Sequence, residues 1–100
     1  MNILLDQAAN VIRDAMEFSG ERRSSKLNEA IGLLEAVKPT RERDGMMALA
    51  YLRLSQTQKE IGKKQDAERN FMVGYSYSRT SREERVRRLA EKMSSEYVVI

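Results

Sequence analysis

A stretch near the middle of the chain, Met46 to Ser78, constrains the fold most, because it has the pattern of two helices that turn back on each other at Gly62. In the first helix, apolar residues recur in two rows on different sides, which predicts that this helix is packed on both sides. The second helix carries small residues at Ala67 and Gly74, where two backbones can approach closely. The sequence therefore predicts an antiparallel helical hairpin.

Two helices are predicted before this hairpin. The first covers residues 3–18 and is stopped by Ser19 and Gly20, since a glycine just past the last periodic residue adopts the left-handed conformation at little cost. Residues 20–25 are expected to form a polar turn, in which Arg22 and Arg23 are most simply solvated; the alternative is that they contact a phosphate or carboxylate. The second helix has an apolar face at helical spacing, formed by Leu27, Ala30, Ile31, Leu34 and Val37.

Polar residues and one proline mark the remaining helix boundaries. Pro39 excludes the helical conformation for the residue before it, and Thr40 is a natural cap for the central helix, expected over residues 41–61. The fourth helix is expected over residues 64–78. Thr80 and Ser81 then have capping-box spacing to the glutamates that follow, which predicts that they open a fifth helix.

The whole chain, residues 1–100, is expected to form one all-helical domain with one core. A single proline and five glycines leave long stretches unbroken, and strand patterns are absent apart from the last few residues. The five predicted helices are arranged as two antiparallel hairpins and a C-terminal capping helix. A closing helix of this kind covers the last seam of a stack of hairpins.

Six positions in the central hairpin have the spacing of a known repeat motif: Tyr51, Leu54, Ser55, Ala67, Phe71 and Gly74. They match its aromatic, large, small, small, aromatic and small positions, so the hairpin resembles a tetratricopeptide repeat (TPR). The sequence departs from the motif at Gln58, where the family usually carries a large residue, and at Arg79, where it often carries proline. The resemblance implies a TPR-like helical protein that binds a peptide or a partner helix.

The chain contains no cysteine and no histidine, which excludes disulfides, thiolate or imidazole catalysis and the usual zinc sites. It also has no phosphate loop or nucleophile motif, so we expect no enzyme, no cofactor and no metal. The N-terminal residues lack the basic region of a signal peptide, and no apolar run approaches the length of a membrane span. A cytoplasmic protein without a membrane partner is expected.

The TPR resemblance implies a partner-binding surface on the central helix. Its contact residues would be Leu49, Leu52, Arg53, Gln56, Lys59 and Glu60. Apolar residues beside Arg53 and Lys59 favour a protein partner that is amphipathic and somewhat acidic, either a helix or a peptide. The alternative is that Leu49 and Leu52 pack on the first or second helix.

Arginines are concentrated in the last part of the chain, where Arg82, Arg85 and Arg88 have the spacing of a basic ridge on the fifth helix. A small nucleic-acid-binding regulator is therefore the alternative function, although a net charge of +3 gives it only weak support. The simpler interpretation is a solvated face with glutamate–arginine pairs at four-residue spacing. The apolar end, residues 97–100, either folds onto the fourth helix or joins subunits in a homo- or hetero-oligomer.

The function that these features favour is a non-enzymatic protein-binding module, a chaperone or an adaptor. It would hold an amphipathic helix or peptide of a partner protein in a helical-repeat groove. In size and predicted architecture the chain is similar to the small TPR chaperones of type III secretion, which hold aggregation-prone subunits before export. A small adaptor or regulatory protein fits the same features.

Overall fold

Helices make up most of the computed structural model, which describes residues 2–97. They are α1 (Ile3–Ala15), α2 (Gly20–Glu35), α3 (Arg41–Glu60), α4 (Lys64–Ser81) and α5 (Glu84–Tyr97). No strand occurs in this range. The prediction of an all-helical fold with five helices is confirmed.

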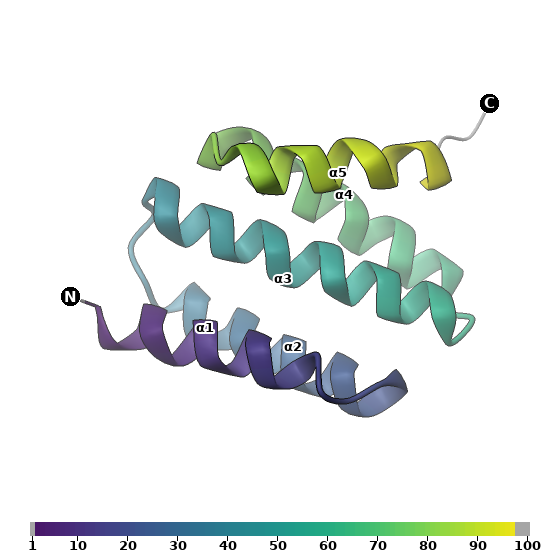
Figure 1. Cartoon of the computed structure of the whole chain (residues 1–100), viewed down its shortest axis with the longest axis horizontal. Helices are drawn as coiled ribbons and strands as arrows, with labels where there is room; N and C mark the ends of the chain where they lie inside the picture. Colours follow the sequence, from purple (N-terminus) through teal and green to yellow (C-terminus); the bar gives the residue numbers. More distant parts are fainter. Residues whose placement is uncertain (1, 98–100) are drawn as a thin grey trace.

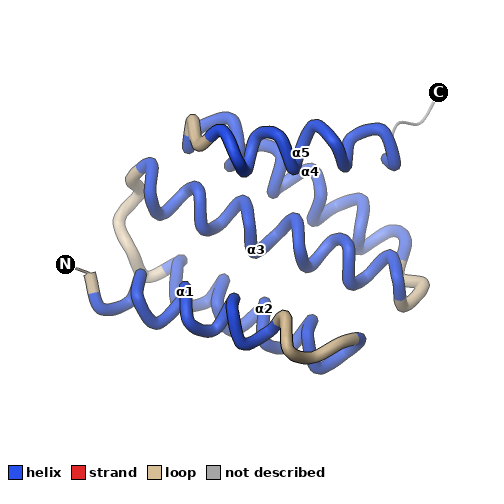
Figure 2. The backbone as a smooth tube through the Cα atoms, in the orientation of Figure 1, coloured by secondary structure: helices blue, strands red, loops and turns tan. Residues whose placement is uncertain are grey.

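Successive helices run antiparallel and form two layers. In Figure 1, α1, α3 and α5 lie in front, and α2 and α4 lie behind them. The loops alternate between the two ends of the molecule (Figure 2), so that α1 pairs with α2 and α3 pairs with α4. The result is a flat slab of 43 × 28 × 18 Å with α3 at its centre.

The core consists of two clusters, one on each side of α3, rather than the single core expected from the sequence. The first cluster joins α1 and α2 to α3, which contributes Met47, Ala50 and Leu54. The second joins α4 and α5 to α3, which contributes Ala48 and Leu52. The prediction that the central helix is packed on two sides is confirmed, because α3 provides a wall for both clusters.

The predicted hairpin of α3 and α4 is also confirmed. A Cβ atom on Gly74 would lie 3.0 Å from Cγ of Leu52 and 3.1 Å from the Leu52 backbone nitrogen, so the two helices meet closely there. The chain reverses at Gly62, which has a φ of +84°, and the N–H of Lys63 donates to the carbonyl oxygen of Gln58 at 2.8 Å. This is the bond with which a left-handed glycine commonly ends a helix.

The turn between α1 and α2 differs from the prediction. α1 ends at Ala15 rather than near residue 18. Gly20 is left-handed, with a φ of +58°, but it is the first residue of α2 and not the stop of α1. Residues 20–25 therefore belong to a helix and do not form a polar turn.

Arg23 explains much of this difference, because its side chain reaches back from α2 to the end of α1. Its Nε donates to the carbonyl oxygens of Phe18 at 2.7 Å and Ala15 at 3.3 Å, and its Nη2 donates to that of Met16 at 3.2 Å. The last carbonyls of a helix have no partner within the helix, and a cation is favourable beside them. Arg23 thus caps α1 from the next helix and makes a longer turn unnecessary.

Replacing this cap should have a measurable cost. We expect Arg23→Ala to lower the free energy of unfolding by about 1 kcal/mol, because the carbonyls at the end of α1 lose a charged donor. Arg22→Ala is the matched control, since the Arg22 guanidinium lies over the Phe18 ring at 5.1 Å without bonding these carbonyls. Its loss should be about half as large or less. Urea unfolding followed by circular dichroism measures both, and equal losses would contradict the capping role.

The cap predictions for the later helices have opposite outcomes. Thr40 caps α3 as predicted, since its Oγ1 accepts from the N–H three residues further on at 3.0 Å. Thr80 and Ser81 do not open α5 but lie in the last turn of α4, and Arg82 follows in a left-handed conformation with a φ of 58°. The Ser81 hydroxyl oxygen still accepts from the N–H of Glu83 at 3.1 Å, so it fixes the junction rather than the start of the helix.

The predicted apolar face of α5 packs onto the hairpin of α3 and α4. Its residues in or beside the second cluster are Val86, Leu89, Ala90, Met93 and Tyr97. α5 therefore covers the end of the stack, as expected for a closing helix. The predictions for residues 98–100 fall outside the described residues.

Candidate partner-binding surface

One face of α3 carries six residues that we call the α3 row. They are Glu42, Met46, Leu49, Arg53, Gln56 and Glu60. Alternating steps of four and three residues keep them on one side of the helix. The two end residues are exposed and the four between them are partly buried. The row lies on the helix that sits between α1 and α5 in the front layer (Figure 1).

The row is apolar in its first half and polar in its second. Met46 and Leu49 pack against the first cluster but keep part of their surface exposed, whereas the adjacent Met47 is buried. In the second half, Nη1 of Arg53 donates to Oε1 of Gln56 at 2.9 Å. This bond holds the guanidinium along the helix. A segment lying on α3 would therefore meet an apolar patch followed by a hydrogen-bonding pair.

Four of the predicted contact residues lie in the α3 row: Leu49, Arg53, Gln56 and Glu60. Leu52 does not, because its side chain has 0% exposure and packs against Gly74 of α4. The prediction that Leu52 contacts a partner is therefore wrong. Both Leu49 and Leu52 are apolar, but Leu52 follows a second successive step of three residues after Met46 and Leu49, which turns it about 120° from Met46, out of the row and towards the hairpin seam.

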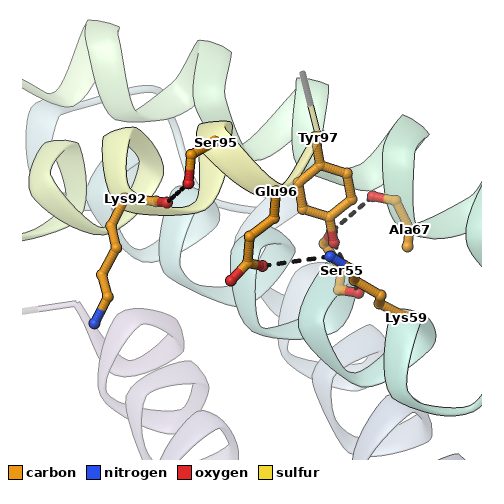
Figure 3. A network of polar contacts seen from close by, with 7 residues as sticks. All are labelled: Ser55, Lys59, Ala67, Lys92, Ser95, Glu96 and Tyr97. Carbon is orange, nitrogen blue, oxygen red and sulfur yellow. Dashed lines mark hydrogen bonds and ion pairs between the residues drawn. The ribbon is translucent and has the colours of Figure 1, made fainter. Parts of the chain in front are cut away.

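Lys59 is also outside the row, because it is turned towards α5. Its Nζ lies 3.6 Å from the Glu96 carboxylate and 5.0 Å from the centroid of the Tyr97 ring (Figure 3). Both side chains of the ion pair are about half exposed, so the pair adds little stability. The sequence predicted that Lys59 contacts a partner, whereas in the structure it contacts Glu96 and Tyr97 of the same chain.

A polar network fixes this end of α3 to α4 and α5 (Figure 3). Ser55 Oγ donates to the carbonyl oxygen of Ala67 at 2.6 Å, and the Tyr97 hydroxyl lies 2.6 Å from the same Oγ. A serine hydroxyl has one proton, so Tyr97 is the donor in the second bond. The Tyr97 ring also stacks on Phe71 at a centroid distance of 4.5 Å. Ser55 was recognised as a small position, but its hydrogen bonds leave no periodic signal in the sequence.

The basic ridge predicted on α5 is interrupted. Arg82 lies in the left-handed junction before α5 and so does not stand one helical turn ahead of Arg85. Arg88 donates to Glu84 at 2.8 Å, with both side chains about three-quarters exposed. This is the glutamate–arginine pair at four-residue spacing that the simpler interpretation predicted.

Within residues 2–97, no group of three or more aspartate or glutamate side chains is placed to hold a metal ion. None of the five described helices is both long enough and apolar enough to cross a membrane. Comparisons with models of known protein families, with curated proteins and with solved structures found no match for the chain.

Proposed function

We propose that the chain is a non-enzymatic protein-binding module, a chaperone or adaptor of the cytoplasm. It would hold an amphipathic helix or peptide of a partner protein along the α3 row. The observation that carries this proposal is the partial exposure of Met46 and Leu49 on the helix that lies between the other four. Apolar side chains left at the surface of a central helix offer the contact that an amphipathic helix needs.

The composition of the row indicates which partner it suits. Apolar residues of a partner helix would cover Met46 and Leu49, and the flexible thioether of Met46 adapts to different shapes. One acidic or amide side chain would then meet Arg53. Glu42 and Glu60 at the two ends disfavour a strongly acidic partner. The expectation of an acidic partner also relied on Lys59, which is paired with Glu96.

The resemblance to TPR proteins supports the same surface. It implies that a partner lies on the central helix, and the four predicted residues that the α3 row contains are on that helix. α1 and α5 flank α3 in the front layer, so they would border a bound segment on both sides (Figure 1). A chaperone role would follow if the bound segment is one that aggregates when exposed.

Two charge-introducing variants of the row test this proposal. Leu49→Glu and Arg53→Glu should each reduce capture of a partner from an extract of the native host by about tenfold or more, because they remove apolar contact or reverse a charge. Leu33→Glu is the control for Leu49→Glu, since Leu33 is also a half-buried leucine packed on the first cluster but belongs to the back layer.

The captured species are compared by mass spectrometry, after circular dichroism has shown that each variant is folded. A partner that the wild type and Leu33→Glu retain, and that both row variants lose, is the expected result. Equal capture by all four proteins would show that the α3 row is not the binding surface.

The nucleic-acid alternative gains no specific support from the structure, since Arg82 is displaced from the helix that carries Arg85 and Arg88.

A further inference from the structure

A hollow of about 560 Å³ lies on the side of α3 opposite to the α3 row. From α3 it is lined by Arg43 and Asp44, and from α4 by Met72, Val73, Tyr77 and Thr80. Asp44 follows Glu42 by two residues, which places it about 160° around the helix from the row. The hollow is therefore a surface separate from the one proposed above.

Arg43 is the unusual residue of this hollow, because its charged side chain is buried and its Nε has no hydrogen bond. The residue is 8% exposed, and its Cζ lies 5.7 Å from the centroid of the Tyr77 ring. Its Nε is 3.1 Å from Oδ1 of Asp44, but neither atom has a hydrogen-bond partner among the described residues. Guanidinium groups carry five N–H donors, and a buried donor without a hydrogen bond is unfavourable; of the Arg43 donors, the one on Nε is in this position.

The terminal nitrogens of Arg43 and the carboxylate of Asp44 offer a donor and an acceptor side by side. Oδ2 of Asp44 lies 3.1 Å from the Thr80 hydroxyl, whose one proton is shared with the carbonyl oxygen of Tyr77 at 3.1 Å, and this contact places the carboxylate at the wall of the hollow. The terminal nitrogens of Arg43 are not among the buried unpaired atoms within residues 2–97, and Arg43 lines the hollow, so these donors are open to a ligand there.

Because the opposite charges of Arg43 and Asp44 lie so close together, the hollow favours a neutral ligand over an ion. An anion attracted by Arg43 meets the negative charge of Asp44, and a cation attracted by Asp44 meets Arg43. A neutral group with one acceptor and one donor satisfies both residues, and the peptide group is such a group.

Apolar side chains at the mouth of the hollow favour a ligand that also carries an apolar group. Met72 is 69% exposed, and Val73 beside it is partly buried. An aliphatic side chain next to the bound peptide group would cover both. The wall formed by Tyr77 is rigid, since this ring stacks on Tyr51 at a centroid distance of 6.0 Å. Burial raises the pKa of the Tyr51 hydroxyl, with Glu35 and Tyr77 adding to the effect, so Tyr51 stays neutral at physiological pH.

We propose that this hollow is a second docking site, which binds a neutral, extended peptide segment of a partner protein that carries an aliphatic side chain. A carbonyl oxygen of the segment accepts from the terminal nitrogens of Arg43, and a backbone N–H donates to the Asp44 carboxylate. The aliphatic side chain packs on Met72. The volume of the hollow is within the range usual for ligand sites.

The probe for this site is N-acetyl-leucine N-methylamide, which has two peptide groups, no charge and an aliphatic side chain. In a titration followed by NMR, we expect saturable shifts of the Met72 methyl signal and the Thr80 amide signal, with a dissociation constant of the order of 1 mM. Sodium acetate and ethylammonium chloride, which carry single charges, should bind about tenfold more weakly or not at all.

Two variants test the assigned contacts. Arg43→Gln should weaken binding of the probe about tenfold by removing the charged donors. Because Arg43 is buried and its loss can perturb the fold, Met72→Ala provides an exposed second change that should weaken binding severalfold and is read from the Thr80 amide. Met16→Ala is the control, since Met16 is an exposed methionine directly after α1 and outside the hollow.

Leu49→Glu should bind the probe like the wild type, which separates this site from the α3 row. Absence of saturable shifts, or equal affinity in Met72→Ala and Met16→Ala, would overturn the proposal. Tighter binding of acetate than of the probe would also overturn it, because the hollow would then be an anion site.

Discussion

Leu52→Ala is expected to lower the free energy of unfolding by about 3 kcal/mol, within the range of about 2–5 kcal/mol found for leucines in well-packed cores. Leu52 has 0% exposure and lies in the second cluster, where it contacts Gly74 across the hairpin seam. Helices α4 and α5 cannot easily close the space left by the missing atoms, because Ser55 of α3 is hydrogen-bonded to Ala67 of α4 and to Tyr97 of α5. Urea unfolding followed by circular dichroism at the helical band measures the loss.

Leu49→Ala is the matched control for Leu52→Ala, because the same substitution is made three residues away on the same helix. Leu49 is only partly buried, so we expect a loss of about 1 kcal/mol or less. Equal losses at the two positions would mean that Leu49 is as enclosed as Leu52, and that the α3 row is not an open face. A charged residue at Leu52 would unfold the protein and so cannot be used to test partner binding.

Gly74→Ala is expected to destabilise the protein by about 2 kcal/mol, although alanine is the better helix former by about 1 kcal/mol. The new methyl group would lie 3.0 Å from two side-chain carbons of Leu52 and 3.1 Å from its backbone nitrogen. The side chain can shift, but the backbone nitrogen belongs to α3 and moves only with that helix. The midpoint of urea unfolding should fall, and unfolding should begin at lower temperature.

Gly32→Ala provides a control of the opposite sign. Gly32 lies within α2, and beyond its chain neighbours and the backbone of its own helix no atom is within 4 Å of the position that its Cβ would occupy. Here only the helix propensity changes, so we expect the protein to gain about 0.5–1 kcal/mol. If both alanine variants are stabilised, the seam between α3 and α4 is looser than the structure shows.

The sequence predicted the elements of the fold well, because helical periodicity and local end signals have local causes. Thr40 and Gly62 act within one turn of their own helices, and both predictions are confirmed. Arg23 and Arg82 show where such reasoning fails. The bonds of Arg23 are to the end of the preceding helix, and Arg82 takes a left-handed conformation that arginine rarely adopts.

The candidate surface was predicted only in part, and for a related reason. Leu49 and Leu52 both lie in apolar rows of one helix, and periodicity alone does not tell which row a neighbour covers. Gly74 indicates which row is covered, since a glycine where two helices meet implies a large residue opposite. That residue is Leu52. Arg43 gave no signal at all, because an arginine in the first turn of a helix is ordinarily solvated.

The position of α3 between two clusters also bears on how the molecule melts. Each cluster lacks a wall when α3 is absent, so neither end of the slab is a self-sufficient folding unit. Unfolding that begins at α1 and α2 would expose Met47, Ala50 and Leu54 of α3. Because α3 is also a wall of the second cluster, unfolding would then extend to α4 and α5. Helix α3 thus couples the two ends of the protein, and a segment bound along α3 would make both ends more rigid.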